Sequence, residues 1–147
     1  MKIANAIILV FMVLVLLACG EVISKNGDSD VPLDSITVVD SNRLQAIATA
    51  KSSIDYFVKS FKLNASNDKM QFSVKKIFKD KDMEEAMWVC VKKIEADTFY
   101  GTLTDIPQMV DDIKEGDSTA VEKCDVIDWM IIDAKNKKVE GGFINHL

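Results

Sequence analysis

The stretch that decides the fold is VIDWMIIDAKNKKVEGGF, residues 126–143. Apolar residues dominate its first part, a polar segment follows at residues 133–138, and a second apolar stretch begins at Val139. Two short strand patterns on either side of a polar turn are typical of an antiparallel β-hairpin. The sequence therefore predicts paired strands over residues 126–132 and 139–144.

The middle of this hairpin combines a Trp and an acid with two glycines. Glycine inside a strand marks a bulge, a bend or a close approach of another group. Our first interpretation is structural: Trp129 lies across Gly141 and Gly142, while Asp128 accepts backbone N–H bonds at the bend. The alternative is a binding surface, in which a peptide or glycan approaches the glycines and stacks on Trp88 and Trp129.

Period-two patterns continue upstream of the hairpin. Strands are predicted on either side of a turn at residues 80–82, at 98–104, where Pro107 follows, and at 118–122. In the second of these strands Met87 and Val89 share one face, and Trp88 and Cys90 share the other.

A helical pattern precedes the strands. Apolar residues recur at three- and four-residue steps, with Lys51 interrupting the stripe, and Asp40 or Ser41 can cap the start. The stripe consists of Leu44, Ile47, Ile54, Val58 and Phe61. We predict an amphipathic helix over residues 41–61. The expected fold is α+β, with this N-terminal helix packed on a curved five- or six-stranded antiparallel sheet or small barrel.

The chain begins with MKIANAIILVFMVLVLLACG. The apolar run Ile3–Leu17 is shorter than the roughly 20 residues of a membrane-spanning helix, and it matches the apolar region of a secretory signal. Residues 16–19, Leu-Leu-Ala-Cys, resemble a bacterial lipobox, in which Cys19 becomes the acylated N-terminus. The sequence predicts a lipoprotein signal peptide at 1–18, a lipid-anchored flexible tether at 19–40 and a single domain at 41–147. An uncleaved anchor or an ordinary signal peptide are the alternatives.

The charge fits an anchored protein of the cell envelope. The formal net charge is −5, and removal of residues 1–18 would take away Lys2 and leave −6. So acidic a chain lacks the basic footprint of a nucleic-acid-binding protein. Membrane attachment would come from fatty acyl chains such as palmitate on Cys19. With Gly20 after the cysteine, we expect the outer membrane facing the periplasm in a diderm, and the cell surface otherwise.

Two further cysteines could pair in an exported protein. If their strands are neighbours, a Cys90–Cys124 disulfide would close a loop of about 34 residues and contribute roughly 3–4 kcal/mol. Two unpaired thiols are the alternative.

The sequence offers few groups for catalysis. The chain has a single histidine, His146, next to the C-terminus, and no motif that predicts a nucleophile, a metal site or a cofactor. The acidic residues at 80–85 and 111–112 fit solvated loops. We therefore favour a non-enzymatic binding module with a protein, peptide or glycan partner. One alternative is a hydrolase that cleaves envelope polymers with two of its own carboxylates. The other is a structural or stress lipoprotein.

Several segments together resemble a known family. They are FSVKKIF at 72–78, MWVCVKKI at 87–94, FYGTLTDIP at 99–107, GDSTAV at 116–121, VIDWMI at 126–131 and GGF at 141–143. In this order they are similar to the YegJ-like bacterial domain of unknown function, the DUF2314 family. The resemblance covers the chain from about residue 70 to the C-terminus. It implies a bacterial domain of unknown function and no catalytic residue.

Overall fold

The computed structural model describes residues 33–146, and their side chains from residue 41 to 144. The predicted signal peptide, Cys19 and most of the predicted tether lie outside the described residues. No helix within 33–146 combines the length and the apolarity that a membrane span needs. The elements are α2 (Leu33–Asn64), β1 (Met70–Asp80), β2 (Met83–Glu95), β3 (Thr98–Leu103), β4 (Ser118–Glu122), η1 (Lys123–Asp125), β5 (Asp128–Asp133), β6 (Lys138–Gly141) and η2 (Phe143–His146).

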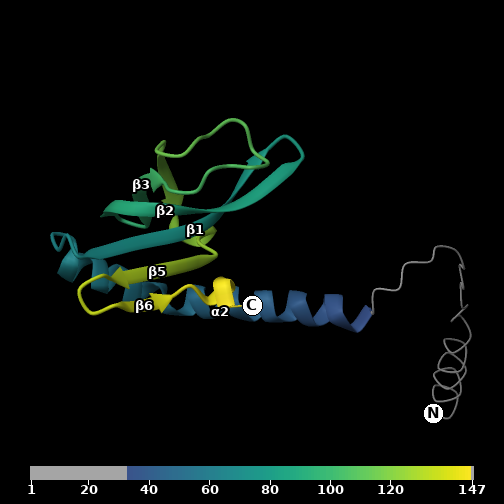
Figure 1. Cartoon of the computed structure of the whole chain (residues 1–147), viewed down its shortest axis with the longest axis horizontal. Coiled ribbons are helices and arrows are strands. Elements are labelled where there is room, and N and C mark those ends of the chain that lie inside the picture. Colours follow the sequence, from purple (N-terminus) through teal and green to yellow (C-terminus); the bar gives the residue numbers. More distant parts are fainter. Residues whose placement is uncertain (1–32, 147) are drawn as a thin grey trace, which may run out of the picture. The chain divides into compact units, whose positions relative to one another are not determined.

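The strands form one antiparallel sheet in the order β4-β3-β2-β1-β5-β6 (Figure 1). The sheet is open, with β4 and β6 at its two edges, and it does not close into a barrel. Helix α2 packs on one face of it, which confirms the predicted α+β fold in its six-stranded form. We call the covered face the helix side and the other the open face.

Helix α2 is longer than predicted. It begins at Leu33 instead of residue 41, so residues 33–40, which the sequence analysis placed in the tether, are helical. Its buried residues are spaced by three or four positions, which keeps them on one side of the helix: Ala46, Ala50, Ile54, Phe57 and Phe61. Leu44, from the predicted stripe, is 67% exposed. Two alanines at the contact let the helix lie close to the sheet.

The core lies between α2 and the helix side of the sheet. Phe57 is fully buried, and its ring lies 5.7 Å from Phe72, 5.9 Å from Phe99 and 5.8 Å from Trp129. Burial of one such side chain stabilises a fold by roughly 1.5–3 kcal/mol. Strand β2 contributes Met87, Val89 and Val91 to the core. Met87 and Val89 share one face of the strand, as the alternation predicted.

Residues 104–117 connect β3 to β4 without regular structure and reach over the tip of the β1–β2 hairpin (Figure 1). Val110 of this loop is buried in the core. The Glu85 carboxylate accepts bonds from the backbone N–H groups of Gln108 and Met109, both at 2.9 Å from Oε2. These bonds lower the pKa of Glu85. Asp80 similarly accepts a bond from the N–H of Asp111. These acids fasten the loop, a role that the solvated-loop interpretation did not include.

The C-terminal strand ends earlier than predicted. Strand β6 stops at Gly141, and the residues from Phe143 onward form the 3-10 helix η2 instead of continuing to residue 144 as a strand. Gly141 and Gly142 have φ values of 78° and 71°. Two consecutive left-handed residues turn the backbone out of the extended conformation, which is why the strand ends there.

Candidate binding site

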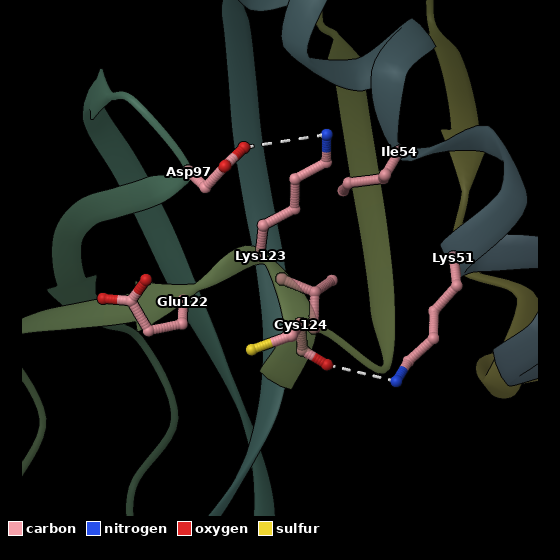
Figure 2. Close-up of a pocket in the computed structure, with 7 residues that line it drawn as sticks. Lys51, Ile54, Asp97, Glu122, Lys123 and Cys124 are labelled. Atoms are coloured by element: carbon pink, nitrogen blue, oxygen red, sulfur yellow. Dashed lines mark hydrogen bonds and ion pairs between the residues drawn. The ribbon is translucent and has the colours of Figure 1, made fainter.

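A cavity of about 580 Å³ opens where α2 meets η1 and the turn between β2 and β3 (Figure 2). We call it the helix-side cavity. It is lined by Lys51, Ile54, Asp97, Glu122, Lys123, Cys124 and Val126. Ile54 and Val126 give it an apolar part, and the remaining residues give it a polar rim. Its size and mixed lining are those of sites that hold a small molecule or a few side chains of a partner.

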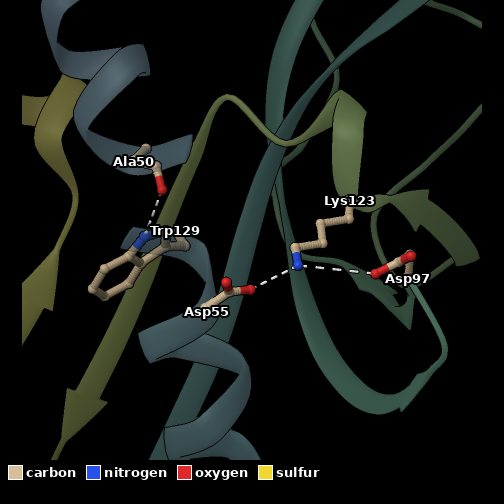
Figure 3. Close-up of polar contacts among 5 residues, drawn as sticks. All are labelled: Ala50, Asp55, Asp97, Lys123 and Trp129. Atoms are coloured by element: carbon tan, nitrogen blue, oxygen red, sulfur yellow. Dashed lines mark hydrogen bonds and ion pairs between the residues drawn. The ribbon is translucent and has the colours of Figure 1, made fainter. Parts of the chain in front are cut away.

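The two lysines of this cavity differ in their partners. Lys123 Nζ lies 2.7 Å from an Asp55 carboxylate oxygen and 3.9 Å from one of Asp97 (Figure 3). The bond to Asp55 raises the pKa of Lys123. Lys51 Nζ donates to the backbone carbonyl of Cys124 at 3.1 Å and forms no ion pair with any described residue. The positive charge of Lys51 is therefore the one that an anionic group of a ligand could neutralise.

A second cavity, of about 450 Å³, lies on the open face over β3 and β4. We call it the open-face cavity. It is lined by Lys92, Tyr100, Gly101, Thr102, Ser118, Thr119 and Ala120. Phe99 and Leu103 of β3 are buried on the helix side. Because side chains alternate along a strand, Tyr100 and Thr102 point to the open face. Lys92, like Lys51, forms no ion pair within the described part of the chain.

The predicted hairpin residues lie inside the domain. Trp129 is 3% exposed, and its indole nitrogen donates to the Ala50 carbonyl of α2 at 3.1 Å (Figure 3). The same nitrogen lies 3.1 Å from the Ser53 hydroxyl. Asp128 is fully buried and accepts backbone N–H bonds from Trp129, Phe143 and Ile144 at 2.8–3.2 Å. The carboxylate thus holds η2 against the start of β5. Neither side chain is available to an external ligand in this conformation.

Gly141 lies directly against Trp129, as the structural interpretation expects. A Cβ at position 141 would come within 2.1 Å of the Trp129 carbonyl oxygen and 2.6 Å of its ring. At Gly142 the nearest such atom is the Met130 sulfur at 3.8 Å. Strand packing, not ligand access, therefore requires the absence of a side chain at position 141.

Trp88 lies on the open face, away from the other tryptophan. It is half-buried, and the Lys75 ammonium lies 5.0 Å from the centre of its ring. This distance suits a cation–π interaction. Of the predicted binding residues, Trp88 is the one with an aromatic ring partly open to solvent, and it is not joined there by Trp129.

Cys90 and Cys124 are both thiols in this structure. Their strands are not neighbours, because β1 separates β2 from β5. Cys90 lies on β2 with a partly exposed side chain, whereas Cys124 lies in η1 on the rim of the helix-side cavity. The condition on which the disulfide prediction rested is therefore not met.

Metal-binding side chains do not cluster in the described part of the chain. Within the described residues no three His, Cys, Asp or Glu side chains are placed to hold a metal ion. His146 falls in η2, with its side chain outside the described part. Asp105, like Asp80 and Glu85, accepts a backbone N–H bond, in this case from Trp88 at 3.0 Å.

Sequence reasoning did not find either cavity. Each is built from segments that are distant in the chain, and only the packing of α2 and the pairing of β4 bring these together. One signal was present for the helix-side cavity: Lys51 interrupts the apolar stripe of the helix, and it reaches across to the carbonyl of Cys124. In the structure Lys51 is exposed beside the buried stripe, which Ala50 and Ile54 continue on either side of it.

The geometry defines a class: a small α+β domain in which one helix covers an open antiparallel sheet and two cavities border one sheet edge. A family model described as "uncharacterized protein conserved in bacteria (DUF2314)" matches residues 40–147, well over half of the chain. The chain belongs to this family, as the sequence resemblance predicted. No curated protein and no solved structure matches it.

Proposed function

We propose that this protein is an exported lipoprotein whose domain is a non-catalytic binding module at the bacterial cell envelope. The observation that carries the binding role is the helix-side cavity, where the ammonium group of Lys51 stands beside an apolar wall without a carboxylate partner among the described residues. An anionic group of a ligand that reaches this ammonium group would form a charge-assisted hydrogen bond with it, which adds affinity and specificity.

The N-terminal sequence supports the envelope location. An export signal that ends in an acylated cysteine matches the N-terminal residues. These are Lys2, the apolar run Ile3–Leu17 and the Leu-Leu-Ala-Cys motif at 16–19. Two acyl chains on one residue hold a protein stably on a membrane, whereas a single acyl chain gives reversible attachment. An anchored binding module meets its partner within the plane of the membrane, which raises the effective concentration of both.

Location and binding are tested separately. The intact mass of the protein purified from its own membranes should correspond to a chain that starts at acylated Cys19. A mass that still contains Met1 would contradict the lipoprotein assignment. For the binding role, a photoreactive benzoylphenylalanine replaces Asp97, which lines the cavity and whose carboxylate lies 3.9 Å from Lys123 Nζ. The matched control carries it at Leu63, which is 74% exposed and does not line the cavity.

Cross-linking in growing cells should give a discrete adduct from position 97 and none from position 63. The Lys51→Glu substitution should abolish the adduct, because it replaces the unpaired cation with an anion. Lys51 is exposed, so the fold should tolerate this change. Equal adducts from both positions, or an adduct that Lys51→Glu leaves unchanged, would remove the cavity from consideration as the binding site.

A further inference from the structure

Strand β4 presents one free edge. It pairs with β3, and Lys123 N–H donates to the Asp97 carbonyl at 2.8 Å while Leu103 N–H donates to the Asp117 carbonyl at 2.9 Å. In an antiparallel pair such bonds alternate along the strand. Residues 117, 119, 121 and 123 therefore direct their backbone groups toward β3. The N–H and C=O groups of Ser118, Ala120 and Glu122 point away from the sheet, and all three residues are exposed.

Strand β4 carries neither a lysine nor a proline, and no bulge interrupts its pairing with β3. Natural edges carry lysine, proline, a bulge or a covering segment, because unpaired backbone groups invite another strand. The opposite edge, β6, carries Lys138 and ends at two left-handed glycines. Strand β4 reads Ser-Thr-Ala-Val-Glu and pairs with β3 in continuous register. Lys75, Lys76, Lys92 and Lys93 lie on the interior strands β1 and β2, so they do not protect β4.

The two cavities border this edge on opposite faces of the sheet. The helix-side cavity includes Lys123 and Cys124, which follow β4 directly, and the open-face cavity includes Ser118 and Ala120. Successive side chains of an extended strand point to opposite faces. A strand added to β4 would therefore direct one side chain toward the helix-side cavity and a neighbouring one toward the open-face cavity. Backbone bonds plus alternate pockets are the two requirements of recognition by strand addition.

The charges of the cavities indicate which strand fits. Each contains one lysine without an ion pair among the described residues, Lys51 on the helix side and Lys92 on the open face. If the added strand were a second copy of β4, it would carry a single carboxylate, that of Glu122. That carboxylate could pair with the lysine on one face of the sheet but not with the lysines on both faces. A segment with acidic side chains on both faces matches both lysines.

We propose that β4 is a strand-addition site for an extended acidic segment of a partner protein. This inference rests on the proposed binding role and names the class of ligand: a peptide bound through its backbone, with carboxylates directed to Lys51 and Lys92. Attraction between exposed charges is screened by salt, so the affinity should fall as ionic strength rises.

The test selects linear peptides from a random displayed library on the full-length protein in lipid nanodiscs. Enriched peptides should be acidic. Their affinity should fall at least about tenfold for Ala120→Pro, which removes an outward N–H and places a ring on the edge. The matched control is Val139→Pro on β6. The Gly142 N–H donates to the Trp129 carbonyl, and Val139 pairs with Ile132. Because bonds alternate along an antiparallel pair, the Val139 N–H points away from the sheet, as that of Ala120 does. This control should leave the affinity unchanged.

The outcomes separate the possible failures. Peptides that bind Ala120→Pro normally but lose affinity for Lys51→Glu would overturn strand addition while leaving the binding role of the cavity intact. Failure to enrich any peptide would overturn the peptide class of ligand. A concentration-dependent dimer in sedimentation, absent in Ala120→Pro, would overturn it in favour of a second copy. Loss of affinity in both Ala120→Pro and Lys92→Glu, with Val139→Pro unaffected, supports the proposal.

Discussion

Replacement of Gly141 by alanine should destabilise the domain more than the same change at any other left-handed glycine. Gly141, Gly142 and Gly116 have φ values of 78°, 71° and 88°. All three substitutions carry the cost of a left-handed non-glycine residue, about 1–2 kcal/mol. Only position 141 adds a steric conflict, because its new Cβ would lie 2.1 Å from the Trp129 carbonyl oxygen. The other two positions have no atom closer than 3.8 Å.

The additional cost can be worked from what must move. Trp129 is held in place, because its indole N–H donates to the Ala50 carbonyl of α2 and its ring packs on Phe57. Strand β6 must therefore shift away from β5, which strains or breaks the 2.8 Å bond from Gly142 N–H to the Trp129 carbonyl. Overpacking contributes about 1–3 kcal/mol and a lost backbone bond about 1 kcal/mol. Together with the left-handed cost, Gly141→Ala should lose about 3–6 kcal/mol of unfolding free energy.

The assay is a guanidinium chloride titration of the full-length protein in mild detergent, followed by tryptophan fluorescence. Midpoint and slope give the unfolding free energy of each variant. Gly142→Ala and Gly116→Ala are the controls, and each should lose about 1–2 kcal/mol. If Gly141→Ala is no less stable than Gly142→Ala, the backbone of β6 moves without cost, and the packing of Trp129 is not what excludes a side chain at position 141.

Three further outcomes test other parts of the structure. Asp128→Asn keeps one acceptor but turns an amide N–H₂ toward a backbone donor, so it should lose about 2–3 kcal/mol of unfolding free energy. The pKa of Glu85 is lowered from 4.5 in the folded protein by its bonds to the backbone N–H groups of Met109 and Gln108. Its stabilisation is therefore complete above pH 4.5 and is lost as the pH falls through the lower folded value, so Glu85→Gln should flatten the decline in unfolding free energy between pH 5 and 3. Cys124 is exposed and Cys90 partly buried, so alkylation of the reduced protein followed by peptide mass analysis should modify Cys124 first.

The strand patterns could be predicted from sequence because each depends on local alternation. The burial of Met87 and Val89, and the position of Trp129 over Gly141, follow from the period of two and from the space that a glycine leaves. The helix was harder. Its predicted stripe used large apolar residues and included Leu44, which is exposed, while Ala46 and Ala50 form part of the real contact. Alanine is weakly apolar in a sequence pattern, yet its small size is what allows the close approach.

The sites could not be predicted because they depend on contacts between distant segments. The bond from Trp129 to the Ala50 carbonyl joins residues 79 positions apart. The bond from Lys51 to the Cys124 carbonyl spans 73 positions. No local pattern predicts where α2 packs on the sheet or that β4 is an edge strand. The sequence analysis offered the hairpin residues Asp128–Trp129 and Gly141–Gly142 as a binding surface only as the alternative to a structural role, and the structure uses them to hold the helix and η2.

The net charge of −5 is also a poor guide to what the domain binds. Several of its acids are already engaged: Asp128 and Glu85 accept backbone N–H bonds, and Asp55 pairs with Lys123. An engaged carboxylate presents less of its charge to a ligand. Lys51 and Lys92, in contrast, line cavities without an ion pair within the described residues. Binding responds to the local field of a cleft more than to total charge. An acidic protein can therefore carry a site for an acidic partner, and the salt dependence of peptide affinity is the measurement that shows it.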